Sequence, residues 1–140
     1  MGTASPARLR RADWVARLYR EVEIQKGEAF AYGKNDCCSF VARCIDAMTG
    51  DNLAEMLTHC YHDARSAKRF LRAEGGMELA VSSFLGDSVP GHNARRGDAC
   101  LVEVEDGPGV GICLGPTIAV RHDGELIYYP LKAAHAHWSV

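Results

Sequence analysis

Apolar residues in the first two-thirds of the chain recur every three or four positions, which is typical of amphipathic helices. The pattern predicts four helices that begin near positions 14, 38, 63 and 77. Asp13 is placed to cap the first helix, and Asn35 or Asp36 to cap the second. Glycines are expected to end the last three helices: Gly50, Gly75 and Gly86.

The last third of the chain has the pattern of half-buried strands. Residues 100–105 and 110–114 alternate between apolar and polar or small positions, and Gly107-Pro108-Gly109 between them is predicted to be a turn. Two further strands, 117–122 and 125–129, flank an Asp-Gly hairpin signal. A strand that ends near Val140 is predicted to be an edge strand. Helices followed by antiparallel strands predict an α+β domain, with the N-terminal helices packed on the C-terminal sheet.

Length and composition predict a single globular domain of 140 residues, with 47% hydrophobic and 24% charged residues. The 16 Lys and Arg against 18 Asp and Glu leave a net charge of −2, which argues against nucleic acid as a partner. No apolar run reaches the ~18 residues of a membrane span. No apolar stretch precedes Asp13, so the sequence predicts no secretory signal peptide and synthesis in the cytoplasm.

Charge is concentrated at the N-terminus, where the first 20 residues contain five arginines and one acidic residue. We therefore divide the chain into a basic N-terminal arm, residues 1–11, and a single α+β domain, residues 12–140. The arm is interpreted either as a solvated segment or as one that contacts an acidic partner surface. The arginines are Arg8, Arg10, Arg11, Arg17 and Arg20.

The cysteines and histidines do not form a recognisable metal or disulfide framework. Six scattered cysteines are too few for a disulfide-stapled scaffold, and we expect reduced thiols. The segments His59–His62 and His135–His137 each contain potential ligands, but neither has the paired spacing of a zinc site. We therefore expect no metal and no cofactor. The cysteines are Cys37, Cys38, Cys44, Cys60, Cys100 and Cys113.

The segment around Cys37 carries the candidate chemistry. Cys37 stands where a loop enters the second predicted helix, and unpaired backbone N–H groups at a helix start favour a thiolate over a thiol. A thiolate is the nucleophile of cysteine enzymes. The alternative is that Cys37 and Cys38 only pack the first turn of the helix.

Several motifs resemble those of the NlpC-type, papain-like cell-wall cysteine peptidases. Residues 36–40, Asp-Cys-Cys-Ser-Phe, are similar to the Asp-Cys-Ser-Gly-Phe element of that family. Gly97-Asp98 followed by a strand, and residues 109–115, resemble its Gly-Asp-strand and His-Val-Gly-Ile-Tyr-Leu-Gly elements. Within that family, the chain most resembles small NlpC-like proteins from phage and prophage tail gene clusters, which carry an Asp-Cys-Cys motif. The resemblance covers about residues 12–140 and implies a papain-like fold with Cys37 as the nucleophile.

The chain departs from this family at the general base. The histidine that opens the family's Val-Gly-Ile element is replaced by Gly109, which cannot take or give a proton. His122 on the following strand is a candidate replacement base for Cys37, and Asp36 a candidate orienting residue. The alternatives are that His122 only ends a hairpin, on the same strand face as Val120, and that Asp36 only caps the helix.

The resemblance and the departure together imply a phage-tail-associated protein with a degenerate cysteine-peptidase site, acting as a structural or accessory component of the tail tip. Its expected partners are other tail proteins and, in the pocket, a peptidoglycan peptide, and its expected location is the virion tail. The alternative function is an active cell-wall peptidase or amidase that uses Cys37 with His122 as base. A cytoplasmic binding module of unknown ligand is a third hypothesis.

Overall fold

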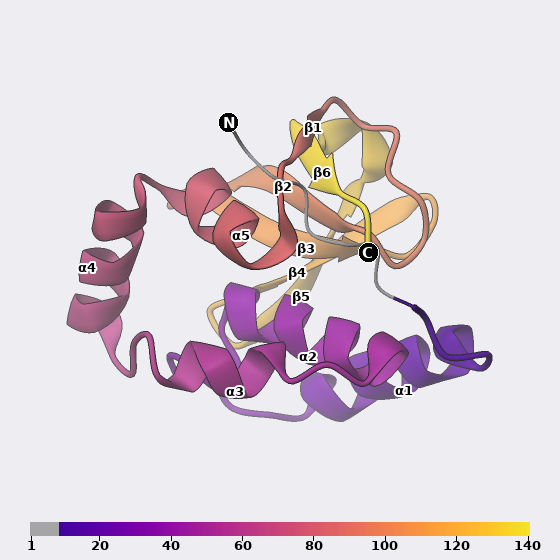
Figure 1. The fold of residues 1–140 in the computed structure, drawn as a ribbon, viewed down its shortest axis with the longest axis horizontal. Helices are drawn as coiled ribbons and strands as arrows, with labels where there is room; N and C mark the ends of the chain where they lie inside the picture. The colour runs from indigo at the N-terminus through magenta and orange to yellow at the C-terminus, as the bar shows by residue number, and fades with distance from the viewer. Residues whose placement is uncertain (1–8) are drawn as a thin grey trace.

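The computed structural model describes residues 9–140, in which helices occupy the N-terminal part and strands the C-terminal part (Figure 1). The helices are α1 (Trp14–Lys26), α2 (Cys37–Thr49), α3 (Leu53–Thr58), α4 (Ala64–Glu74) and α5 (Met77–Leu85). The strands are β1 (Val89–Pro90), β2 (Ala99–Val104), β3 (Gly107–Cys113), β4 (Thr117–His122), β5 (Glu125–Pro130) and β6 (Ala136–Trp138). A 3-10 turn, η1 (Leu131–Ala133), links β5 to β6. The predicted α+β layout is confirmed.

The six strands form one antiparallel sheet in the order β1-β6-β2-β3-β4-β5. After β5, at one edge of the sheet, the chain passes through η1 towards the opposite edge, where β6 pairs with both β1 and β2. The prediction of an edge strand near Val140 is therefore wrong, because the chain order of the strands is not their order in the sheet. The edges are β1 and β5.

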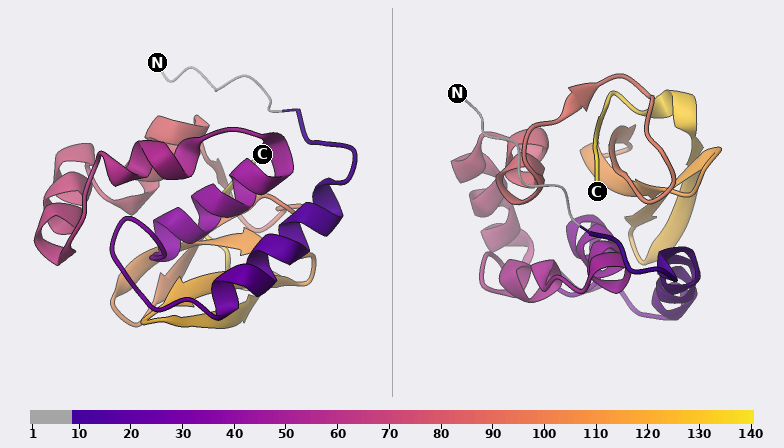
Figure 2. Two further views of the ribbon diagram at one scale, coloured as in Figure 1. Left: turned by 90° about the horizontal axis from the view of Figure 1, so that it is seen from below. Right: turned by 45° about the vertical axis from the view of Figure 1, so that its right-hand side comes forward.

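Helices α1 and α2 lie side by side against one face of the sheet (Figure 2). The main hydrophobic core lies between them and the strands, where Phe40 and Ile45 of α2 are fully buried with Val110 and Ile112 of β3. Burying side chains of this size stabilises a fold by about 1.5–3 kcal/mol each. This packing holds the start of α2 beside β3.

The opposite face of the sheet is buried as well. Cys100 and Val102 of β2 pack there with Ile118 and Val120 of β4, and Leu131 of η1 lies against them. Because both faces of β2, β3 and β4 are covered, most residues of these strands are buried, whichever face they point to. Among residues 9–140, no helix is both long enough and apolar enough to span a membrane.

The sequence pattern predicted most elements correctly, and three differences remain. Asp13 stands at the start of α1, but its carboxylate pairs with Arg17, 2.7 Å away, and makes no cap hydrogen bond. The six-residue helix α3 was not predicted. Residues 107–109 belong to β3, and the turn lies at 105–106. Pro108 is tolerated because this half of β3 pairs with β2 alone.

The predicted basic arm lies mostly at residues 1–8, outside the described residues. At its end, the Arg10 guanidinium donates hydrogen bonds to the Val140 carbonyl and the Asp98 carboxylate, and lies 4.2 Å from the centre of the Trp14 ring. Arg10 thus joins the described N-terminal end to the C-terminal residue of the chain.

Candidate functional site

The candidate site is built around the first turn of α2, which Asp36 organises. One Asp36 carboxylate oxygen accepts hydrogen bonds from the Ser39 N–H (2.9 Å) and the Tyr61 hydroxyl (2.9 Å), and the other accepts from the Gly33 N–H (2.6 Å). Gly33 has a φ of 80°, and a Cβ there would lie 2.7 Å from the Tyr61 carbonyl oxygen. Asp36 is therefore the helix cap, and its oxygens are engaged by the protein itself.

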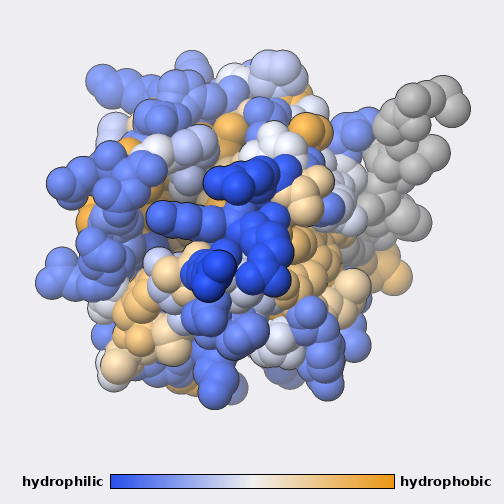
Figure 3. All heavy atoms as spheres, turned by 90° about the vertical axis from the view of Figure 1, so that its left-hand side faces the viewer, coloured by the Kyte–Doolittle hydropathy of each residue, from blue (hydrophilic) through white to orange (hydrophobic). Residues whose placement is uncertain are grey.

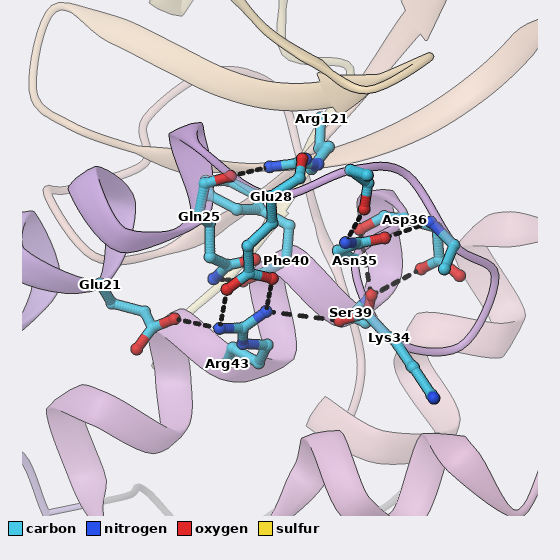
Figure 4. Close-up of polar contacts among 12 residues, drawn as sticks. Glu21, Gln25, Glu28, Lys34, Asn35, Asp36, Ser39, Phe40, Arg43 and Arg121 are labelled. Carbon is cyan, nitrogen blue, oxygen red and sulfur yellow. Dashed lines mark hydrogen bonds and ion pairs between the residues drawn. The ribbon is translucent and has the colours of Figure 1, made fainter.

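The loop before Asp36 is held by contacts within itself and with α2 and β4 (Figure 4). The side chain of Asn35 bridges the Ala29 carbonyl and the Ala31 N–H. The Glu28 carboxylate binds the Arg43 guanidinium of α2 at 2.6 and 2.8 Å, which holds the pKa of Glu28 below its usual range. From β4, the buried Arg121 donates to the carbonyls of Gln25 and Glu28.

Cys37 is the first residue of α2 and is half-buried, so its predicted place at a loop-to-helix junction is confirmed. A hydrogen bond with the Cys38 side chain lowers the pKa of Cys37, and the Val110 N–H acts in the same direction, against the effect of burial. The same contact and burial raise the pKa of Cys38, whose sulfur lies 3.6 Å from the Met77 sulfur. Of the two adjacent thiols, Cys37 is the one suited to act as a nucleophile.

A pocket of about 220 Å³ opens beside Cys37, where β3 and β4 separate. β3 and β4 pair with each other only at Ile112–Ala119 and Cys113–Ile118. In contrast, all of β2 pairs with β3, and all of β5 pairs with β4. The separated ends of β3 and β4 and the start of α2 form the walls. The lining includes Tyr32, Cys37, Val104, Gly109, His122 and Asp123.

Gly109, at the position of the family's base, lies in this pocket without a side chain. A Cβ at Gly109 would lie 3.2 and 3.4 Å from the two methyl carbons of Val104, which is a tight contact. The φ of Gly109 is not in the left-handed region, so the backbone accepts other residues. A side chain at position 109 would therefore require the Val104 side chain of the neighbouring strand to shift slightly.

His122 lines the same pocket as Cys37, on the strand face that carries Ile118 and Val120, as predicted. Among residues 9–140, no hydrogen bond joins His122 to the Cys37 thiol, and the buried His122 Nε2 has no hydrogen-bond partner. The His122 Nε2 lies 3.4 Å from the Asp123 carboxylate and 3.7 Å from the Asp106 carboxylate. The structure therefore brings Cys37 and His122 to one pocket but does not pair them.

The carboxylates around His122 were missed by sequence reasoning. The ligand atoms of Asp106, His122 and Asp123 all lie within 4.8 Å of one another, and these residue types can bind a divalent cation. The sequence predicted Asp123 only as part of the hairpin turn, and its φ of 49° fits that turn. Asp106 lies in the turn between β2 and β3, 16 positions before His122, and no local spacing relates them.

The arrangement favours a thiolate but provides little for the later steps of peptide hydrolysis. Cys37 can attack an electrophilic carbon that enters the pocket, and the N–H groups of the first helical turn can stabilise negative charge. Release of an amine also requires a proton donor within hydrogen-bond reach of the reacting atoms. No imidazole is bonded to Cys37 in the described part of the chain, and Asp36 is engaged as a cap.

Comparison with protein families matches residues 9–140 to the model described as "Domain of unknown function (DUF6950)", and the chain belongs to this family. Searches of curated proteins and of solved structures find no match.

Proposed function

We propose that this DUF6950 protein is a phage- or prophage-tail-associated, NlpC-like protein with a degenerate cysteine-peptidase site, and that it serves as a structural or accessory component of the tail. The tail role rests on the motif resemblance of residues 36–40 and 109–115, and the observation that carries the degenerate site is the pair Gly109 and Val104. The residue in the position of the base is glycine, and the Val104 side chain lies close enough to make a tight contact with any Cβ placed there.

The remaining features of the site support binding more than turnover. The pocket beside Cys37 is open, and its walls combine aromatic and aliphatic side chains with a few polar groups. Loss of a general base costs about 10²–10⁴-fold in rate. The pocket therefore holds a peptide segment, from peptidoglycan or from a neighbouring tail protein, without cutting it at a useful rate.

The role in the tail is tested in the phage or prophage that encodes the chain. Mass spectrometry of purified virions should detect the protein in tails, and a deletion should leave particles without functional tails. Particles that contain Cys37→Ala should assemble and infect normally, because the proposal gives the thiol no essential chemistry. Virions that lack the protein would refute the proposal.

The degenerate site is tested by digesting purified peptidoglycan with the wild type and with Cys37→Ala, and measuring released fragments by chromatography and mass spectrometry. We expect no fragments from either protein. Fragments released by the wild type alone would show an active enzyme instead.

A gain-of-function variant tests whether the base is what the site lacks. In Gly109→His with Val104→Ala, the second substitution removes the methyl groups that would contact the new side chain. We expect peptide-bond cleavage that disappears when Cys37→Ala is added. A folded double variant that remains inactive would mean that the site lacks more than the base.

A second candidate function is an active peptidase or amidase with His122 as base. The observation in its favour is that His122 and Cys37 line one pocket, with carboxylates close enough to orient the imidazole. If the wild type cleaves peptidoglycan, His122→Ala should abolish the activity, whereas His62→Ala, an exposed histidine outside the pocket, should not.

A further inference from the structure

Helix α4 is the most exposed helix of the described chain and stands at one side of the molecule (Figure 1). None of its 11 residues is fully buried. It is attached through Ala67 and Phe70, which pack against the main core, and through Leu71, which lines the Cys37 pocket. The remaining surface of the helix is free to contact another molecule.

That surface is strongly basic. At about 100° per residue, Arg65, Lys68, Arg69 and Arg72 fall within an arc of about 100°, on the side away from Phe70. With a rise of about 1.5 Å per residue, they extend over roughly 10 Å. All four are exposed. We call these four residues the α4 basic face.

Within the described residues, the α4 basic face lies near the Asp63 carboxylate, whose pKa Arg69 helps to lower. In the described part of the chain, none of its four cations makes an ion pair or a side-chain hydrogen bond. Three cations of α1 and α2, in contrast, bind carboxylates within 3.1 Å: Arg17, Lys26 and Arg43. Figure 3 views the side of the molecule on which α4 lies, and hydrophilic residues gather at its centre.

We propose that the α4 basic face docks an acidic segment of a partner protein. Arginine guanidinium groups bind carboxylates in a planar, two-pronged geometry, and three of the four cations are arginines. Arg65, Arg69 and Arg72 follow the spacing i, i+4, i+7, which matches carboxylates with the same spacing on a partner helix.

The charge of the whole chain favours an acidic protein over nucleic acid. Nucleic-acid-binding domains are commonly basic overall, with pI above about 9. This chain has a net charge of −2 and a pI near 6.3, so the positive charge is confined to a local patch. A patch about 10 Å long fits a short acidic helix, and docking there does not depend on the chemistry of Cys37.

The test uses the full chain and a fluorescein-labelled peptide of about 20 residues, helical, with glutamate at i, i+4 and i+7 positions and alanine elsewhere. Binding is measured by fluorescence anisotropy at about 50 mM salt, where charge attraction is only partly screened. Replacing Arg65, Arg69 and Arg72 with glutamine should weaken binding at least about tenfold. Glutamine has nearly the helix propensity of arginine, and circular dichroism should show an unchanged fold.

The matched control replaces Arg20, Arg95 and Lys132 with glutamine, which removes three exposed charges elsewhere. This control should change the dissociation constant by less than about twofold. Equal weakening by both triple variants would overturn the proposal, because the attraction would then follow net charge and not the α4 basic face.

Two further arms test the class of partner and the role of charge. A labelled DNA duplex of about 20 base pairs should bind more weakly than the acidic peptide, and tighter DNA binding would overturn the proposal in favour of nucleic acid. Replacing Arg65, Arg69 and Arg72 with glutamate should transfer binding to a lysine-rich peptide of the same design. Failure of that transfer in a folded variant would also count against the proposal.

Discussion

The character of Cys37 follows from its position at the first turn of α2. Its side chain interacts with the Cys38 thiol and with the Val110 N–H, and both contacts favour the thiolate. Cys38 is one residue further along, and its pKa moves in the opposite direction. Adjacent residues of the same type thus have different chemistry, because only one of them benefits from these donors.

The pKa of Cys37 gives a prediction for labelling with iodoacetamide, which reacts with thiolates. The rate at Cys37 should reach half its maximum at a lower pH than the rate at Cys60, because the pKa of Cys37 is lowered and burial raises that of Cys60. Cys38→Ala should move the Cys37 profile to higher pH, and Cys38→Ser, which keeps a donor, should move it less. Mass spectrometry of samples quenched at each pH measures the profiles, and identical profiles for Cys37 and Cys60 would contradict this assignment.

Asp36 provides a second prediction at a single side chain. Asp36→Ala removes the cap of α2 and leaves the buried Tyr61 hydroxyl without its acceptor. We expect a loss of about 2–4 kcal/mol in the free energy of unfolding, measured with urea. The control is Asp63→Ala, which removes the exposed cap of α4 and should cost about 1 kcal/mol. Equal losses would mean that the buried network around Asp36 adds nothing to capping.

Among the secondary-structure elements, the contact between α1 and β4 determines one wall of the site. Arg121 extends from β4 to the carbonyls of Gln25 and Glu28 at the end of α1, and it also lines the Cys37 pocket. A positive charge at a helix C-terminus is favourable because the last carbonyls carry partial negative charge. The loop that leads to Cys37 starts at this anchored end.

Arg121→Ala should therefore destabilise the protein strongly. The substitution leaves two carbonyl groups without their donor and a cavity between α1 and β4, and we expect a loss of about 3–5 kcal/mol. Arg17→Ala, which removes an exposed ion pair within α1, should cost less than about 0.5 kcal/mol. Thermal or urea unfolding measures both. A small effect at Arg121 would show that α1 is held by its apolar face alone.

The helices and the sheet share the main core, and we therefore expect them to unfold together. The main core joins residues of α1, α2, α3 and α5 to residues of β2, β3 and β6. Arg10, near the start of the described residues, also donates a hydrogen bond to the Val140 carbonyl at the C-terminus. The helical part therefore has no core of its own, whereas the sheet has a second, smaller core on its opposite face.

We expect a single cooperative unfolding transition, with a free energy within the range of about 5–15 kcal/mol found for domains. Far-ultraviolet circular dichroism should give the same urea midpoint as tryptophan fluorescence, which reports Trp14 on α1 and the buried Trp138 on β6. Separate fragments 1–86 and 87–140 should not fold. Two distinct midpoints would show that the helical layer unfolds separately from the sheet.

Much of the local structure was predictable because its signals come from residues close together in the chain. The stripe spacing predicted α1, α2, α4 and α5, and Asp36 and Gly50 mark the two ends of α2. The helix α3 was missed because six residues are too few to establish a periodicity. Pro108 was assigned to a turn because its tolerance in β3 depends on which strands lie on either side.

The sequence by itself determined the α+β layout, the place of Cys37 at the start of a helix and the absence of histidine at position 109, since each depends on residue identity and on neighbours a few positions away. Only the tertiary structure decided the order of the strands, the separation of β3 and β4 that opens the pocket, and the close approach of Val104 to Gly109. It also decided that Arg121 holds Gln25, 96 positions earlier in the chain. Such pairings depend on packing between distant segments, which no local pattern records.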